Sequence, residues 1–365
     1  MSEFDLIKKH FTRPTPSAEL GVGDDAALLC VSDGKELAIS TDMLVSGTHF
    51  SPDADPFQLG YKTLAVNLSD LAAMGAVPRW ATLSLSLPFV QGGEACPERP
   101  HPNPDGTTSH STKHDKAVQV AGYLPAGEGT NESLRETSFT VDEEWLRRFS
   151  EGFFALADDN GVELIGGDTT RGPLNLCVTI MGEVPRGKAL RRDGAKVGDD
   201  VWVSGKLGQA ALGLANLQGK FKFYGEVRDE CLKALHQPQP RVSLGLALRG
   251  IANSAVDISD GLLADLGHIL ERSNVGAELD IEALPIVDDG VEKEVAQQCA
   301  LAGGDDYELC FTAPENQHDV LMALAEQLKF PLTRIGHIKA ELGCVVRDVE
   351  GKAMKIEKGG YDHFA

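Results

Sequence analysis

Short apolar runs typical of strands alternate along this chain with longer segments in which apolar residues recur at helical spacing. Residues 37–40 predict a short buried strand that ends at Thr41 and Asp42. Residues 56–74 predict a helix, because a proline opens this segment and a glycine follows it. Residues 79–87 alternate between apolar and polar side chains, which predicts another strand.

The pattern is interrupted between about residues 90 and 139, where Gly, Pro, Ser, Thr and His accumulate. A loop of this length is unusual inside a compact domain, so we expect a flexible, disordered insertion at the surface. Cys96, His101, His110 and His114 could bind a soft metal there. Their spacing fits no known zinc pattern, so we favour the surface insertion.

A second helix is predicted after this stretch. Residues 140–143 have the spacing of a capping box, and Gly161 suits a left-handed cap at the helix end. Its expected core stripe consists of Trp145, Phe149, Phe153 and Leu156. Strands are then predicted at 163–165 and 174–181, and the first of them leads directly to Asp168.

The whole pattern predicts a mixed α/β fold in two domains. The chain has 365 residues, which is enough for two separate cores. A stretch rich in Gly, Arg and Lys at 184–200 marks the expected boundary, giving domains 1–184 and 185–365. The clearest elements of the second domain are two strands at 201–204 and 255–258 and a helix at 262–272.

The composition of the chain argues against some classes of binding partner. The formal net charge of -21 argues against nucleic acid or an anionic membrane surface, which both need a basic footprint. No apolar run reaches the about 18 residues that span a bilayer, and the polar N-terminus lacks a signal-peptide core. The seven cysteines are scattered without a C-x-x-C pair, so we expect neither a disulfide framework nor structural zinc. The expected compartment is the cytoplasm.

Acidic residues carry the candidate chemistry, because many of them stand beside Gly, Ser or Thr after an apolar run. If they converge at strand ends, two carboxylates about 4 Å apart repel by roughly 4 kcal/mol at an effective dielectric near 20. Such a cluster needs hard cations such as Mg²⁺ and suggests a phosphorylated substrate such as ATP. The acids concerned are Asp24 and Asp25, Asp42, Asp70, Asp168, Asp257 and Asp260, and Asp305 and Asp306.

Each motif also has a plain structural interpretation. The glycines before Asp25 are typical of a tight turn as well as of a phosphate loop. Asn67 and Asp70 share one face of an apolar helix with few basic residues nearby, which favours metal binding over a salt bridge. Asp260 could be only a helix N-cap, although that helix N-terminus would also attract phosphate.

Neither the basic residues nor the known nucleotide-binding motifs identify a phosphate site in the sequence. Arg191 and Arg192 could neutralise phosphate charge or form a solvated basic loop, and the sequence does not decide between these. No P-loop sequence and no protein-kinase H-R-D or D-F-G element is present. The Rossmann G-x-G-x-x-G pattern also fails, because the third glycine is missing.

Taken in order, the motifs resemble those of the thiamine-monophosphate kinase family, in the aminoimidazole-ribonucleotide-synthetase-like superfamily. The resemblance covers nearly the whole chain except the insertion. It implies phosphorylation of thiamine monophosphate to the diphosphate by ATP, through direct in-line transfer with several Mg²⁺ ions. It also implies a homodimer formed through the N-terminal sheets of two α/β domains. The matching stretches are GVGDDAALL, AISTDMLVSGTHF, YKTLAVNLSDLAAMGA, LIGGDTTRG, ALRRDGAKVGD, VDISDGLLADLGHI, GGDDYELCF and GYDHF.

The resemblance also implies roles for single residues. No covalent nucleophile is expected. ATP would contact Gly167, Asp168, Arg192 and Ser259, and thiamine phosphate would face His49, Asp305 and Tyr361. The metal ligands would be Asp25, Ser40, Thr41, Asp42, Asp70, Asp168, Asp257 and Asp260.

This chain departs from the family pattern at two places. Asp305 stands where the family usually has Glu, and a carboxylate one methylene shorter is expected to shift or weaken the thiamine contact. The insertion at about 90–139 is not expected either, although long loops are thermodynamically tolerable.

Three other functions compete with the kinase hypothesis. They are another ATP-using ligase or synthetase of the superfamily, a sensor that binds without turnover, and a magnesium-dependent phosphatase. His49 and the GYDHF stretch argue against the first, and the full set of acids argues against the second. A phosphatase differs from a kinase in needing no ATP.

Overall fold

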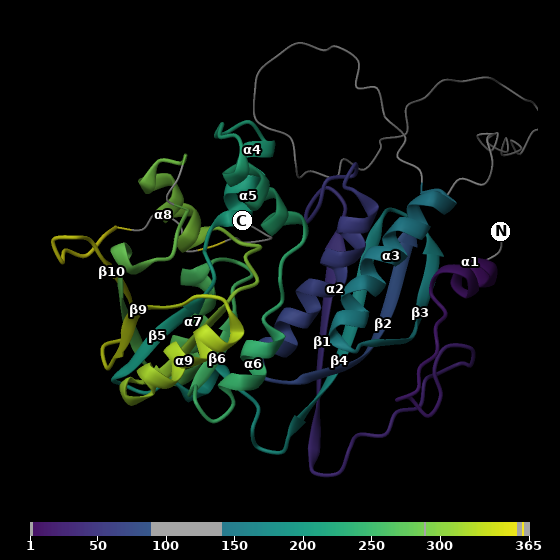
Figure 1. The fold of residues 1–365 in the computed structure, drawn as a ribbon, viewed down its shortest axis with the longest axis horizontal. Coiled ribbons are helices and arrows are strands. Elements are labelled where there is room, and N and C mark those ends of the chain that lie inside the picture. The colour runs from purple at the N-terminus through teal and green to yellow at the C-terminus, as the bar shows by residue number, and fades with distance from the viewer. Residues whose placement is uncertain (1–2, 89–140, 288–289, 356–359, 361–365) are drawn as a thin grey trace, which may run out of the picture.

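A four-stranded sheet organises the first half of the chain (Figure 1). This computed structural model describes residues 3–88, 141–287, 290–355 and 360. The strand order is β1-β4-β2-β3, in which β2 and β3 run parallel and the other neighbours are antiparallel. The strands are β1 (Lys35–Val45), β2 (Val77–Leu87), β3 (Glu163–Arg171) and β4 (Asn175–Pro185).

Two long helices cover one face of this sheet. They are α2 (Pro56–Ala73) and α3 (Glu143–Asn160), while the short α1 (Glu3–His10) lies beside α3 and β3. The backbones of α2 and α3 approach closely, because a Cβ on Gly60 would lie 2.0 Å from the Phe149 carbonyl oxygen. The predicted stripe of α3 is buried, which confirms it as core.

The second half of the chain forms a six-stranded sheet in the order β10-β7-β9-β5-β8-β6. Its strands are β5 (Asp199–Ser204), β6 (Ser254–Asp257), β7 (Gly276–Asp280), β8 (Leu309–Pro314), β9 (Leu332–Lys339) and β10 (Gly343–Arg347). Its α-helices are α4 (Gln209–Leu217), α5 (Glu226–His236), α6 (Val242–Leu248), α7 (Leu262–Ser273), α8 (Lys293–Ala302) and α9 (His318–Leu328). Short 3₁₀ turns are η1 (Arg192–Gly194), η2 (Ile281–Ala283) and η3 (Glu315–Gln317).

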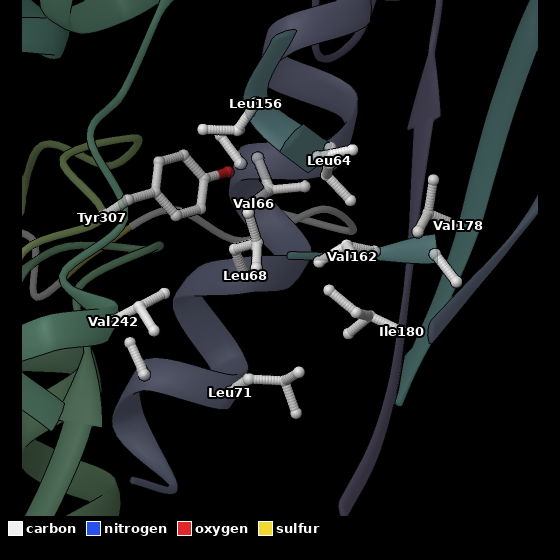
Figure 2. Packing of buried hydrophobic residues seen from close by; sticks show 14 of the residues in the cluster. Leu64, Val66, Leu68, Leu71, Leu156, Val162, Val178, Ile180, Val242 and Tyr307 are labelled. Carbon is white, nitrogen blue, oxygen red and sulfur yellow. The ribbon is translucent and has the colours of Figure 1, made fainter. Parts of the chain in front are cut away.

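Helix α2 lies between the two halves and is buried from both sides. Figure 2 shows Ile180 on the side of the first sheet and Tyr307 and Val242 on the side of the second half. A Cβ on Gly245 of α6 would lie 1.9 Å from the carbonyl oxygen of Ala72, so α6 also rests directly on α2. This helix therefore brings residues of both halves to one place.

Two predicted boundaries were wrong, because polar residues continue the strands. Strand β1 extends to Val45, so Asp42 lies inside it, where its Cα pairs with that of Val178. Strand β3 extends to Arg171, so Asp168 lies inside it, opposite Ser84. These acids sit on strand faces and edges rather than after strand ends.

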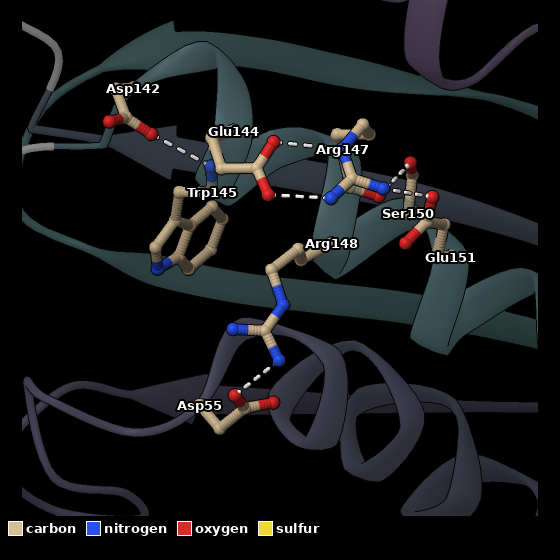
Figure 3. A network of polar contacts seen from close by, with 8 residues as sticks. All are labelled: Asp55, Asp142, Glu144, Trp145, Arg147, Arg148, Ser150 and Glu151. Carbon is tan, nitrogen blue, oxygen red and sulfur yellow. Dashed lines mark hydrogen bonds and ion pairs between the residues drawn. The ribbon is translucent and has the colours of Figure 1, made fainter.

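The start of α3 also differs from the predicted capping box. Its N-cap is Asp142, whose carboxylate accepts the Trp145 N–H at 2.8 Å (Figure 3). Arg148 then donates to Asp55, the N-cap of α2, at 2.6 Å, so one ion pair joins the starts of both helices. Gly161 ends α3 with a φ of 64°, as predicted. The insertion at about 90–139 lies outside the described residues. None of the described helices is long and apolar enough to cross a membrane.

Candidate active site

Acidic side chains from three elements converge where α2 meets the second half. Asp42 comes from β1, Asp70 from α2 and Asp257 from the end of β6. Asn67 accepts the backbone N–H of Asp42 at 3.1 Å, and the Ser40 hydroxyl donates to Asp70. Asn67 and Asp70 therefore share one face of α2, as expected, and both contact β1 there.

Burial raises the pKa values of all three carboxyl groups, and repulsion from Asp70 adds to the shifts of Asp42 and Asp257. Burial, followed by repulsion from Asp70, raises the pKa of Asp42 to about 7. Burial and the same neighbour raise the pKa of Asp257 to about 8. The pKa of Asp70 is also raised by burial, although hydrogen bonding from Ser40 and the nearby charge of Arg192 act against this shift. Asp260 contributes further repulsion at Asp42, so four of the predicted metal ligands form one electrostatic cluster.

The loop that carries Ser259 and Asp260 is held by an acid that sequence reasoning did not single out. One carboxylate oxygen of Asp265 accepts the backbone N–H groups of Ser259, Asp260 and Gly261 at 3.0, 3.0 and 3.1 Å. The N-cap of α7 is Gly261, so the interpretation of Asp260 as an N-cap was wrong. Because Asp265 occupies these three donors, they are not free to bind phosphate.

A cavity of about 550 Å³ opens beside the acid cluster. Ser40 and Asp70 line one side of it, and Asp257 lines another. The other charged lining residues of the second half are the basic Arg191, Arg192, His268 and Arg272 and the acidic Asp193 and Glu271. Arg191 is paired with Asp193 at 2.7 Å, whereas Arg192 is close enough to Asp70 to affect its pKa. Acids facing guanidinium groups across a cavity suit a polyphosphate with its cations.

A second cavity, of about 800 Å³, lies between α2 and the α4–α5 pair. His49 and Asp305, both predicted to face the substrate, line it together with Lys62 and His236. The Nδ1 atom of His49 accepts the Val45 N–H at 3.0 Å, so its Nε2 carries the proton in the neutral ring. The backbone N–H of Asp305 donates to the Ser259 carbonyl at 2.8 Å and so connects this cavity wall to the loop that carries Ser259 and Asp260.

Other predicted site residues lie elsewhere. Asp25 belongs to an exposed turn between Leu20 and Leu28, which pair as an isolated bridge. Asp168 is exposed on β3, the edge strand farthest from β1. Among the described residues, neither of them lines the two cavities.

Thr41 and Gly167 have evident structural contacts. Thr41 faces away from Ser40 and Asp42, and its hydroxyl lies 2.9 Å from that of Thr179 on β4. A metal at the cluster would therefore meet Thr41 through its backbone carbonyl. Gly167 packs against β2, since a Cβ there would lie 1.9 Å from the Leu83 carbonyl oxygen. Tyr361 lies outside the described residues.

The acid cluster fits divalent cations that arrive with a nucleotide. Across the described ranges, no group of three or more His, Cys, Asp or Glu side chains closes around one ion. Mg²⁺ commonly uses one or two carboxylates and completes its octahedron with water and substrate phosphates. Burial raises the pKa values of Asp42, Asp70 and Asp257, and a bound cation would favour their ionised forms.

Comparison with known proteins assigns a class to this fold. The family model for the AIR synthase related protein, N-terminal domain, matches residues 23–99 and 131–184. The model for the AIR synthase related protein, C-terminal domain, matches residues 196–349. Both halves therefore have the AIR synthase related architecture, and the first match omits residues 100–130 of the predicted insertion.

Relatives define the family within this class. The chain is 43% identical over 372 residues to thiamine-monophosphate kinase from Escherichia coli (strain K12), covering 100% of this chain and 98% of the relative. A crystal structure of thiamine-monophosphate kinase from Stenotrophomonas maltophilia K279a aligns with a TM-score of 0.73 and 45% identity, covering 93% of each chain. AaThiL complexed with AMPPCP and TMP aligns with a TM-score of 0.68 and 27% identity, covering 99% of this chain and 96% of that chain. The chain belongs to the thiamine-monophosphate kinase family.

Proposed function

We propose that this protein transfers the γ-phosphoryl group of ATP to thiamine monophosphate, giving thiamine diphosphate with the help of Mg²⁺. One observation carries the proposal: Asp257 in the wall of the acid-lined cavity is followed by a loop whose Ser259 carbonyl accepts the backbone N–H of Asp305, in the wall of the larger cavity. The first cavity suits a triphosphate with its cations, and the second has room for a heteroaromatic substrate. The AMPPCP and TMP of the related complex match these two ligand types.

The roles follow from the positions of the residues. Asp42, Asp70, Asp257 and Asp260 would hold the Mg²⁺ ions, with the Thr41 carbonyl at their side. These ions would neutralise charge on the transferred phosphoryl group. Arg192 would contact the nucleotide phosphates, and Ser259 would do so from the loop that Asp265 fixes. Roles for Asp25, Asp168, Gly167 and Tyr361 remain expectations from the family.

No described residue is needed as a covalent nucleophile in this mechanism. The two cavities would place the acceptor phosphate of thiamine monophosphate in line with the γ-phosphorus of ATP. Positioning of this kind, together with charge neutralisation, is the main source of rate in phosphoryl transfer. Asp70 and Asp257 would hold the Mg²⁺ ions in position. His49 and Asp305 would hold the acceptor, thiamine monophosphate.

We also propose a homodimer formed through the open face of the first sheet, meaning the face opposite α2 and α3. Leu37, Ile39 and Met43 of β1 are exposed there, Ile39 and Met43 by 60% and 56%. Exposed apolar residues gathered on one face mark an interaction surface. The two domains, 1–184 and 185–365, and a cytoplasmic location, where ATP is available, belong to the same proposal.

The test is product analysis with the purified protein, ATP, Mg²⁺ and thiamine monophosphate. We expect thiamine diphosphate and ADP, and neither in the presence of EDTA. A variant without residues 90–139, run in parallel, tests whether the insertion matters. Release of phosphate from thiamine monophosphate without ATP would identify a phosphatase instead, and binding without any turnover would identify a sensor.

A further inference from the structure

Lys62 is a buried cation in a helix segment that is mostly apolar. Its side chain is 5% exposed, and it shares its helix face with Leu59 and Val66 at spacings of three and four residues. A buried ammonium group is costly unless it is paired, and an apolar side chain of similar size is often the more stable choice. Packing alone therefore does not explain the positive charge of Lys62, and we look for a role in binding.

The pairing partner of Lys62 is Asp305. The ammonium nitrogen lies 2.9 Å from Oδ2 of Asp305, and both residues line the 800 Å³ cavity. The pair is asymmetric, because the Asp305 side chain is 31% exposed and that of Lys62 only 5%. The cation thus lies behind the carboxylate, which faces the cavity.

Tyr307 holds the other oxygen of the same carboxylate. Its hydroxyl donates to Oδ1 of Asp305 at 3.1 Å, and Figure 2 shows its ring directed toward α2. Asp305 and Tyr307 both have left-handed backbones, with φ of 69° and 50°. Residues in this region persist where their surroundings fix them, as the bonds from Asp305 to Ser259 and from Tyr307 to Ile258 do here.

We propose that Lys62 is a positioning residue for substrate recognition: it fixes the Asp305 carboxylate toward the cationic ring of thiamine monophosphate. This inference rests on the proposed function. Lys62 and Tyr307 hold one oxygen each, while the half-exposed carboxylate still lines the cavity.

The test is a double-mutant cycle with Lys62→Met, Asp305→Asn and the double variant, comparing KM for thiamine monophosphate, KM for ATP and kcat. Loss of a charged hydrogen bond predicts that Lys62→Met raises KM for thiamine monophosphate by about tenfold to a hundredfold. KM for ATP should stay at the wild-type value. Lys62→Arg, which keeps the charge, should lie between wild type and Lys62→Met.

The double variant decides whether Lys62 acts through Asp305. Once the carboxylate is gone, loss of Lys62 should raise KM for thiamine monophosphate no further than Asp305→Asn alone. This comparison does not need Lys62→Met alone to fold, and thermal melting checks that Asp305→Asn, which leaves the buried Lys62 unpaired, is folded. Additive losses, or a wild-type KM in Lys62→Met, would overturn the proposal. Lys233→Met, the same change on the exposed face of α5, is the matched control.

A substrate analogue tests the cationic ring directly. The wild-type protein should prefer thiamine monophosphate over an analogue with a neutral thiophene in place of the thiazolium, and Asp305→Asn should lose this preference. Equal KM values for both compounds in the wild type would overturn the assignment. A wild-type protein that forms no thiamine diphosphate would instead contradict the proposed function.

Discussion

At the scale of single residues, the carboxyl group of Asp70 connects stability to function. It is buried beside Asp42 and Asp257, where burial raises the pKa values of all three groups and repulsion from Asp70 adds to the shifts of the other two. The folded protein without metal therefore disfavours the ionised carboxylates that cation binding requires. The acid cluster is a case in which a functional arrangement lowers the stability of the unliganded protein.

The first prediction concerns Asp70→Asn. The amide keeps the size of the side chain and removes its charge, so kinase activity should fall by about a hundredfold or more, as for other lost charge-stabilising groups. The same change should leave the thermal midpoint of the metal-free protein unchanged or raise it, because repulsion within the cluster is relieved. Activity assays and thermal melting in EDTA measure both effects.

The control for Asp70→Asn is the same substitution at Asp159, an exposed acid on α3. It should change neither activity nor melting. Near-wild-type activity in Asp70→Asn would contradict the metal-binding role, and a strong fall in its melting temperature would show a structural role instead.

At the scale of elements, the contact between α2 and α3 depends on glycine. A Cβ on Gly152 would lie 1.9 Å from the carbonyl oxygen of Phe57, and backbone cannot give way as a flexible side chain can. Gly152→Ala should therefore lower the free energy of unfolding by about 1–3 kcal/mol, the usual cost of overpacking. Denaturant unfolding provides the measurement.

Gly267→Ala is the matched control for this change. Gly267 lies inside α7, and a Cβ there would meet nothing within 4 Å. Alanine should stabilise this helix by about 0.5–1 kcal/mol, because glycine loses more backbone entropy on folding. Equal effects at both positions would show that the close contact of α2 with α3 is not what demands Gly152.

The elements with strong periodicity could be predicted from the sequence, whereas their polar extensions could not. Helices α2 and α3 follow from their apolar spacing, and the convergence of Asp42, Asp70 and Asp257 follows from acids set in apolar segments. The exposed side of Thr41 would have followed from strand periodicity, had β1 been extended past Asp42.

Pairings between distant residues could not be predicted in this way. Lys62 meets Asp305 across 243 positions, so the sequence shows only a lysine in an apolar helix. Arg241 and Glu308 form a similar buried ion pair that sequence reasoning also missed. Asp265 stands only a few residues from the loop it holds, but its role depends on three backbone N–H groups turning toward it. Tertiary geometry decides these contacts.

At the scale of the whole molecule, the open face of the first sheet should hold two copies together. Met43→Lys places a charge among the exposed apolar residues of β1, so we expect it to shift the protein from dimer to monomer. Analytical ultracentrifugation of the wild type and the variant measures this. Val349→Lys, at a residue 81% exposed in the second half, should leave the dimer intact. A wild-type monomer, or a Met43→Lys dimer, would contradict the proposed interface.

The free energy of unfolding of the metal-free protein should fall as pH rises. Stabilisation by Mg²⁺ should instead increase as pH rises. The pKa values of Asp42 and Asp257 are raised from 3.8 to about 7 and about 8 in the folded protein. Between pH 3.8 and about pH 8 the folded state binds more protons than the unfolded state, so the free energy of unfolding falls as pH rises. Histidines with lowered pKa values, such as His236, act in the opposite direction, but only below their ordinary value of 6.5.

We therefore expect the thermal midpoint in EDTA to fall between about pH 6.5 and pH 8.5, by roughly 1–2 °C for each kcal/mol lost in a chain of this length. Mg²⁺ with an unreactive ATP analogue should stabilise the protein most at the upper end, where the carboxylates are ionised and protons no longer compete. Asp257→Asn should flatten the EDTA curve, because it removes the group whose pKa is raised to about 8. A midpoint in EDTA that rises with pH across this window would show that the acids ionise without penalty, and the need for cations at this cluster would lose its physical basis.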